Sequence, residues 1–175
     1  MVVVDLVEGD ISQQDTDAIV NAANSSLFGG GGVDGAIHRA AGPTLLDECR
    51  RVRAEVWPRG LPTGRAVATH GGSLRAKWVI HTVGPVYSTS PDPIAELAAC
   101  HASSLAVADE LGAATVAFPA ISTGVYGYPL PGAARVALDT VRSAETRVER
   151  VLFVLFGREA YRAFAGARDA IDRGR

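Results

Sequence analysis

Short apolar runs alternate with longer amphipathic stretches from one end of the chain to the other. Six runs have the length and residue content of strands, and they lie at residues 2–7, 17–21, 65–69, 77–83, 115–118 and 148–156. Five stretches have the periodicity of helices, and they lie at residues 34–41, after Pro43, and at 92–111, 131–143 and 158–171. Strands that alternate with helices predict a three-layer α/β/α sandwich around a mixed central sheet of about six strands, with much parallel pairing.

The length and composition of the chain are those of a single globular domain. Its 175 residues are 47% hydrophobic and 21% charged, so we expect residues 1–175 to bury one core without disulfides or metal. The first residues run into a strand pattern rather than a signal peptide, and no apolar run approaches the ~20 residues of a membrane helix. We therefore expect a cytoplasmic protein that does not enter membranes, and we further expect a monomer.

Charge and cysteine content exclude several classes of function. The net charge of -2 gives no basic footprint for bulk nucleic-acid binding, so we expect no nucleic-acid partner. Cys49 and Cys100 are the only cysteines, and neither belongs to a CxxC pair or to a Cys/His cluster with metal-ligand spacing. They are typical of reduced thiols, and the sequence predicts neither a metal nor another cofactor.

Four consecutive glycines, residues 29–32, form the most unusual segment of the chain. Such a run is costly in chain entropy and is typical of places where the backbone approaches a ligand closely or takes a positive φ. The helix that follows begins near Val33 or Asp34, where its free N–H groups and its dipole favour an anion. The segment therefore predicts a phosphate site that needs no lysine; the alternative is a flexible surface loop.

The same segment satisfies the G-x-G-x-x-G pattern of dinucleotide-binding proteins through Gly30, Gly32 and Gly35. In those proteins the first glycine follows a strand immediately, and an acidic residue ends the next strand about 20 residues later. Here eight residues separate the strand from the first glycine of the pattern. The acids near the required distance lie in a helical or pre-proline segment, and they are Asp47, Glu48 and Glu55. The spacing therefore disfavours a Rossmann-type dehydrogenase.

A second loop, at residues 119–129, follows a strand and precedes a helix. It supplies hydroxyl groups and unobstructed N–H groups, from Ser122, Thr123, Gly124 and Gly127. Two loops of this kind at the carboxyl ends of strands are able to hold a pyrophosphate between them. The alternative is a tight turn that only caps the next helix.

Five motifs follow one another along the chain. They are Gly9-Asp10-Ile11, NAAN at residues 21–24, GGGGVDGAIHRAAG at 29–42, WVIHTVGP at 78–85 and ISTGVYGYP at 121–129. Together they resemble the motifs of macro domains, and most closely those of the MacroD-type ADP-ribosylhydrolases. The resemblance extends from about Val4 to Phe164, and it implies the macro domain fold. One departure lies at residues 71–74 (GGSL), a surface turn where relatives carry a bulkier pair.

The resemblance implies a binding site for ADP-ribose. The Asp10 side chain would accept a hydrogen bond from the adenine amino group, the Ile11 N–H would bind the adjacent ring nitrogen, and Phe156 would stack on the adenine. The diphosphate would lie between two loops, formed by Gly30, Gly31, Gly32 and Val33 and by Ser122, Thr123, Gly124 and Val125. Tyr126 would pack against the distal ribose, the one farther from the adenine.

The resemblance also implies a reaction at the distal ribose. Asn24 and Asp34, ten residues apart as in the hydrolases, match the pair that contacts this ribose and its scissile ester. Asn24 would hold ribose hydroxyls, Asp34 would orient or polarise water, and His38, one helical turn later, has a supporting role. An unperturbed aspartate is a poor base at neutral pH. Either the pocket raises its pKa, or the phosphate of the substrate helps to activate the water.

Several of these residues have structural alternatives. Asp10 and Asn24 could act in turns, Asp34 could cap a helix, and Phe156 could belong to the core. Asn21 is interpreted as structural, bracing the turn after its strand. The remaining histidines have no recognisable partners and are interpreted as satisfied structural residues, and they are His70, His81 and His101.

The implied function is hydrolysis of the ester that joins mono-ADP-ribose to Asp or Glu side chains of proteins, with O-acetyl-ADP-ribose as a related substrate. An ester has a reasonable leaving group, and the motifs contain neither a G-x-S-x-G elbow nor a Cys/His pair, so no metal or covalent nucleophile is expected. The partners would be ADP-ribose and mono-ADP-ribosylated proteins. Two alternatives stay open: a non-catalytic module that binds ADP-ribose, and a phosphatase acting on phosphorylated ADP-ribose.

Overall fold

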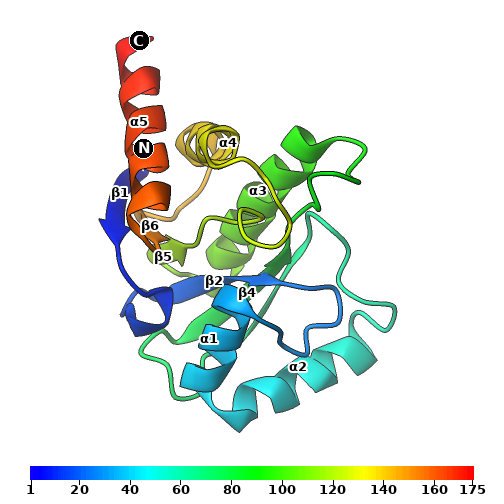
Figure 1. Ribbon diagram of the computed structural model, residues 1–175. Coiled ribbons are helices and arrows are strands. Elements are labelled where there is room, and N and C mark those ends of the chain that lie inside the picture. The colour runs from blue at the N-terminus through cyan, green and yellow to red at the C-terminus, as the bar shows by residue number, and fades with distance from the viewer.

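A six-stranded sheet lies between two layers of helices in the computed structural model, which describes residues 1–175 (Figure 1). The strands are β1 (Val3–Glu8), β2 (Ala18–Ala23), β3 (Ala66–His70), β4 (Trp78–Val83), β5 (Thr115–Phe118) and β6 (Arg150–Leu155). The helices are α1 (Gly32–Ala41), α2 (Pro43–Glu55), α3 (Pro93–Leu111), α4 (Leu130–Ser143) and α5 (Arg158–Arg173), with a 3-10 helix, η1, at Ile11–Gln13. The predicted three-layer α/β/α sandwich with a mixed sheet is confirmed.

The sheet has the order β1-β6-β5-β2-β4-β3, and only β3 runs antiparallel to its neighbour. Side chains alternate between its two faces, as the period of a strand requires. In β2, Ala18 and Val20 belong to the core beneath α3, α4 and α5, whereas Ile19 belongs to the core beneath α1 and α2. Both faces of β2 are therefore covered, and its residues are almost all buried, as expected of a central parallel strand.

The larger core is built around three aromatic rings that come from different elements. Phe118 of β5, Phe153 of β6 and Phe164 of α5 are all fully buried. The ring centroids of Phe118 and Phe153 are 5.7 Å apart, and those of Phe153 and Phe164 are 5.2 Å apart. These spacings are typical of stabilising aromatic pairs, and they fix α5 against the sheet next to the loops that follow β5 and β6.

All eleven predicted elements are present, and wherever both ends were predicted they differ from the observed ends by at most two residues. The 3-10 helix η1 was not predicted, because a single turn of three residues has no periodicity to detect. No helix of the protein has the length and apolar character needed to cross a membrane.

The five parallel strands place their carboxyl ends along one edge of the sheet, in the order β1, β6, β5, β2, β4. Ligand sites of open α/β sheets lie at this edge. Every residue with a predicted role in binding lies in a loop or helix start that follows one of these strands.

Candidate functional site

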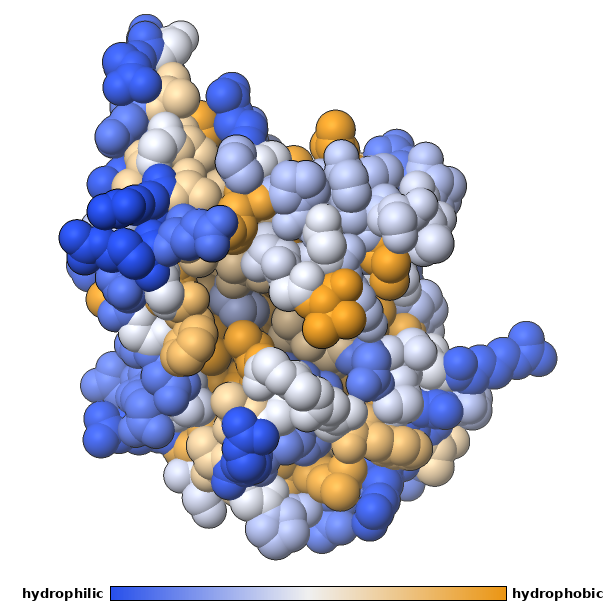
Figure 2. Space-filling view, in the orientation of Figure 1, coloured by the Kyte–Doolittle hydropathy of each residue, from blue (hydrophilic) through white to orange (hydrophobic).

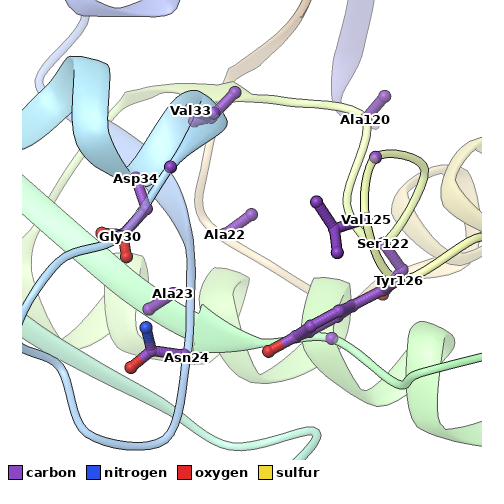
Figure 3. A pocket seen from close by; sticks show the side chains of 14 residues that line it. Ala22, Ala23, Asn24, Gly30, Val33, Asp34, Ala120, Ser122, Val125 and Tyr126 are labelled. Carbon is purple, nitrogen blue, oxygen red and sulfur yellow. The ribbon is translucent and has the colours of Figure 1, made fainter.

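A pocket of about 350 Å³ opens at the carboxyl ends of β2 and β5. Figure 2 shows this face of the molecule hollowed near its middle, and Figure 3 shows the side chains that line the pocket. The lining residues are Ala22, Ala23, Asn24, Gly30, Gly31, Gly32, Val33, Asp34, Gly84, Ala120, Ser122, Gly124, Val125 and Tyr126. The two loops singled out in the sequence thus face one another across one cavity.

The first wall of the pocket is the glycine loop and the start of α1. Gly31 precedes the helix and has no side chain to cap it, so the N–H groups of the first turn have no partner within the helix. Gly32 has a φ of 57°, in the left-handed region that favours glycine. A Cβ at Gly35 would overlap with the carbonyl oxygen of Gly30, so only glycine lets α1 pack this closely against the loop. The helix dipole and the open N–H groups make this wall suited to an anion.

The second wall is the turn that begins at Ser122. This residue has a φ of 67°, which costs a residue with a Cβ about 1–2 kcal/mol. The turn is held by hydrogen bonds from the Tyr128 N–H to the Ser122 carbonyl (2.8 Å) and from the Gly127 N–H to the Gly124 carbonyl (3.0 Å). The Ser122 side chain is buried, yet its hydroxyl has no hydrogen-bond partner in the protein. A strained residue beside a pocket is typical of a functional site, while the hydroxyl itself packs against Gly84.

Asn24 and Asp34 meet at one end of the pocket. Figure 3 shows Asp34 and Gly30 on one side of Asn24, with Tyr126 reaching toward Asn24 from the other. A Cβ placed at Gly30 would lie 3.4 Å from both the Asn24 amide nitrogen and Asp34 Oδ2. The structure therefore brings together the two residues that the sequence predicts for the reaction.

Asn24 also acts in a turn, which was the structural alternative given for this residue. Its Nδ2 donates to the Gly29 carbonyl oxygen (3.0 Å), and its Oδ1 accepts from the Ser26 N–H (3.1 Å). These bonds fix the direction of the amide and shape the start of the glycine loop. The two roles are compatible, because the same side chain lines the pocket.

Behind Asp34 lies a chain of buried hydrogen bonds that the sequence analysis missed. Asn21 Nδ2 donates to Asp34 Oδ1 (2.8 Å) and lies 3.1 Å from His81 Nδ1. On the other side of the ring, His81 Nε2 is 2.9 Å from the Thr69 hydroxyl. His81 is hydrogen-bonded, as a satisfied structural histidine should be, but its link through Asn21 to Asp34 was not predicted. Asn21 lies inside β2 and braces Asp34 rather than a turn after the strand. The partner atoms belong to β2, β3, β4 and α1, so no local pattern could reveal them.

The carboxyl group of Asp34 is in an unusual electrostatic setting. Its side chain is buried, and this burial raises its pKa from the ordinary value of 3.8, while the hydrogen bond from Asn21 and the nearby His38 act in the opposite direction. His38 Nε2 lies 3.4 Å from Asp34 Oδ1, without the geometry of a hydrogen bond. Burial therefore acts in the direction of the first of the two explanations, a pKa of Asp34 raised by its surroundings.

Replacing Asp34 with asparagine is expected to stabilise the protein at neutral pH. Because the pKa of Asp34 is higher in the folded state than in the unfolded chain, folding loses stability as the pH rises from 3.8 through the raised pKa. Asparagine keeps an oxygen for the Asn21 N–H and carries no charge. Scanning calorimetry should show a melting temperature a few degrees higher for Asp34→Asn at pH 7, with the difference shrinking toward pH 4. A lower melting temperature at pH 7 would contradict the burial argument.

The residues assigned to adenine lie at the other end of the sheet edge. The Gly9 N–H donates to the Leu155 carbonyl (2.9 Å), which holds the ends of β1 and β6 together and places Asp10 near Phe156. Asp10 Oδ1 accepts from the Ser12 N–H (2.9 Å) and hydroxyl (2.7 Å), so Asp10 does cap η1. The Phe156 side chain is 85% exposed, which excludes the alternative that it belongs to the core.

The remaining predicted residues divide into those that line the pocket and those beside it. Asp10, Ile11, Thr123 and Phe156 lie outside the pocket lining. The Thr123 hydroxyl donates to the Ala120 carbonyl (2.8 Å) and so stabilises the turn. Conversely, Gly84 lines the pocket but was not predicted, although it follows β4 within the WVIHTVGP motif. A Cβ at this position would overlap with the Ser122 hydroxyl, so the pocket requires glycine there.

Comparisons with known proteins agree with this geometry. The sequence profile of the Macro domain family matches residues 20–137. The chain is 52% identical over 164 residues to the O-acetyl-ADP-ribose deacetylase of Salmonella gallinarum, covering 91% of this chain and 90% of that protein. It is 51% identical over 159 residues to the ADP-ribose glycohydrolase MACROD2 of Xenopus laevis, covering 87% of this chain and 37% of that longer protein. A solved structure of a mutant Oceanobacillus iheyensis macrodomain with ADPR superposes with a TM-score of 0.93 at 42% identity, covering 96% of this chain and 92% of that one.

Proposed function

The chain belongs to the macro domain family, and from this premise we propose that it binds ADP-ribose and hydrolyses the ester that joins mono-ADP-ribose to Asp or Glu side chains. O-acetyl-ADP-ribose would be a second substrate of the same pocket. The observation that carries the proposal is the meeting of Asn24 and Asp34 at one end of a pocket whose two walls suit a diphosphate.

The order of the strand ends sets the direction in which ADP-ribose would lie. Adenine would lie at β1 and β6, between Asp10 and Phe156, and the distal ribose would lie at β2, beside Asn24. Three interstrand steps of about 4.8 Å separate β1 from β2, so these two ends are on the order of 14 Å apart. The diphosphate would then lie over β5 and β2, between the first turn of α1 and the Ser122 turn. The exposed ring of Phe156 has an open face for stacking.

Backbone groups would hold the diphosphate without any cationic side chain. No Lys, Arg or His lines the pocket, so the open N–H groups of α1 and of the Ser122 turn would supply the hydrogen bonds. Binding energy from adenine and diphosphate, remote from the reacting bond, would orient the distal ribose against Asn24 and Asp34.

Hydrolysis would consume one water for each ester. The ester C–O bond breaks, the hydroxyl of water ends on one fragment and its proton on the other, and the products are ADP-ribose and a free carboxylic acid. Asp34 would orient the water, take up its proton and pass it to the leaving oxygen, and its raised pKa makes it a better proton acceptor than an ordinary aspartate. Asn24 would hold the ribose hydroxyls in place.

The proposal is tested by measuring ADP-ribose binding and ester turnover separately. Calorimetry with ADP-ribose and a continuous assay of O-acetyl-ADP-ribose hydrolysis, both with chelator present, should give tight binding and turnover. Tight binding without turnover of any ester would make the protein a binding module instead. Release of inorganic phosphate from phosphorylated ADP-ribose, in the absence of ester hydrolysis, would favour the phosphatase.

A further inference from the structure

A second pocket, of about 330 Å³, adjoins the first at the distal-ribose end. The two share Asn24, Gly84 and Tyr126, so they lie on either side of these residues. The other residues that line the second pocket are Ser25, Thr63, Val83, Val86, Thr89, Ser90, Pro91 and Glu96. It lies on the β4 side of the first pocket, which is the side away from the adenine end.

The second pocket is polar and carries a single charged side chain. Glu96, in the first turn of α3, accepts a hydrogen bond from the Ser90 hydroxyl (2.9 Å). No Lys, Arg or His lines either pocket. The segment after β4, which contributes Val86 to the second pocket, is held to the loop that lines the first pocket. The Tyr87 N–H donates to the Tyr126 carbonyl (2.9 Å). The only formal charge in the second pocket is therefore the negative charge of Glu96, and several hydroxyl groups add to its polar surface.

We propose that this second pocket binds the acyl side of the ester, namely the polypeptide around the modified Asp or Glu, and that Glu96 selects polypeptides with a basic residue beside the modification. This rests on the proposed function, because it assumes that the distal ribose lies at Asn24. The second pocket adjoins the first at Asn24, so it is placed to receive the polypeptide next to the scissile bond. Its negative charge attracts a neighbouring Lys or Arg and repels an acidic flank or a phosphate.

The test uses two peptides that each carry one mono-ADP-ribosylated Glu, flanked by Lys in one and by Asp in the other. Their binding to the Asp34→Asn variant is measured by calorimetry at low salt. This variant should leave the peptides intact, so the measurement reports binding without turnover. The Lys-flanked peptide should bind about fivefold more tightly, and the preference should decrease at high salt. Adding Glu96→Gln, which keeps the size and the hydrogen-bonding capacity of the side chain, should remove the preference, and Glu96→Lys should reverse it.

Turnover of O-acetyl-ADP-ribose provides the control, because an acetyl group has no flanking residues. Glu96→Gln should change this turnover by less than about twofold, since Glu96 is not part of the reacting end. Two results would overturn the second-pocket assignment. One is a flank preference that persists in Glu96→Gln, and the other is an equal loss of binding for both peptides and of turnover for O-acetyl-ADP-ribose. If the wild type hydrolysed no ester at all, the proposed function would fail, while the binding comparison would still decide the assignment of the second pocket.

The buried chain behind Asp34 carries an independent inference. Asn21 has two amide hydrogens, and the geometry directs one to Asp34 Oδ1 and the other to His81 Nδ1. His81 Nδ1 must then be the unprotonated nitrogen, and Nε2–H donates to Thr69. If the Asn21 amide were reversed, its oxygen would face the carboxylate of Asp34, which is repulsive.

We infer that His81 is a positioning residue, which holds the Asn21 amide so that it donates to Asp34. The ring is fully buried, and this burial lowers its pKa to about 3, so the neutral form is present at neutral pH. The other titratable groups around Asp34 are His38 on α1 and Cys49 on α2, and Cys49 Sγ lies 3.8 Å from His81 Nε2. Thr69 fixes the tautomer of His81 from β3.

The pair Thr69→Val and Thr69→Ser tests this inference with little change of volume. Valine removes the acceptor for Nε2–H, which weakens the hold on Asn21, whereas serine keeps it. Because the Asn21 bond lowers the pKa of Asp34, Thr69→Val should move the acid limb of the kcat/KM profile to higher pH and lower kcat severalfold. KM should change little, and Thr69→Ser should restore the profile. A Thr69→Val profile that superimposes on that of the wild type would overturn the inference. If Thr69→Val does not fold, His81→Gln, in which an amide oxygen can accept from Asn21, should still show turnover.

Discussion

Replacing Asp34 with alanine is expected to lower ester hydrolysis by about 10²-fold or more while ADP-ribose affinity stays within a few-fold. Asp34 belongs to the first turn of α1, but its carboxyl group lies beside Asn24, at the end of the pocket where the reaction would occur. Asp34 should therefore stabilise the transition state and have little effect on the binding of the product, ADP-ribose. Steady-state kinetics with O-acetyl-ADP-ribose and calorimetry with ADP-ribose measure the two quantities on one preparation.

The matched control for this change is Asp34→Asn, which keeps the hydrogen bond from Asn21 but loses the charge. Both variants should be inactive if proton transfer to Asp34 matters. Activity retained by asparagine would mean that Asp34 only positions Asn21 and the helix start. Equal losses of binding and turnover in Asp34→Ala would instead assign this residue a structural role at the start of α1.

The second large effect is expected from Gly32→Glu, which should abolish ADP-ribose binding. Gly32 lines the pocket at the first turn of α1, and its neighbourhood is open, since a Cβ there meets no atom within 4 Å. A glutamate would fill this space and place a negative charge where the diphosphate would lie. We expect an affinity loss greater than about 10²-fold by calorimetry, which corresponds to about 2.7 kcal/mol.

Two further variants separate charge from backbone strain at this position. Gly32 has a φ of 57°, so any side chain there is strained, and Gly32→Ala reports this strain alone. Gly32→Gln adds the bulk of glutamate without its charge. Affinity should decrease in the order alanine, glutamine, glutamate. If alanine alone caused the full loss, loop geometry rather than the anion would explain the effect. Unchanged affinity in Gly32→Glu would remove the diphosphate assignment of this loop.

The elements of the fold could be predicted from the sequence because each has its own periodicity. The glycine loop could also be recognised in the sequence, because four glycines before a helix start favour close approach of the backbone to an anion. The spacing of Asn24 and Asp34 gained meaning only from the resemblance to a family. That the two side chains lie close together, on either side of Gly30, is seen only in the folded chain.

Contacts between distant segments were beyond the reach of the sequence. His81 is sixty residues from Asn21 and twelve from Thr69, and the three meet only because β2, β4 and β3 are neighbours in the sheet. The pattern of a strand indicates which face a residue is on, but it does not indicate which residue lies opposite. Likewise, the requirement for glycine at position 84 arises from Ser122, which belongs to another strand end. The strain at Ser122 itself has no signature in its residue type.

The most direct test of the central claim is release of ADP-ribose from a protein mono-ADP-ribosylated on Glu or Asp, with chelator present, by the wild type and by Asp34→Ala. A protein modified on serine through a bond that is not an ester serves as the control substrate. We predict release from the ester-linked protein by the wild type alone. No release by the wild type, with ADP-ribose still binding tightly, would contradict the account and leave the protein as an ADP-ribose-binding module.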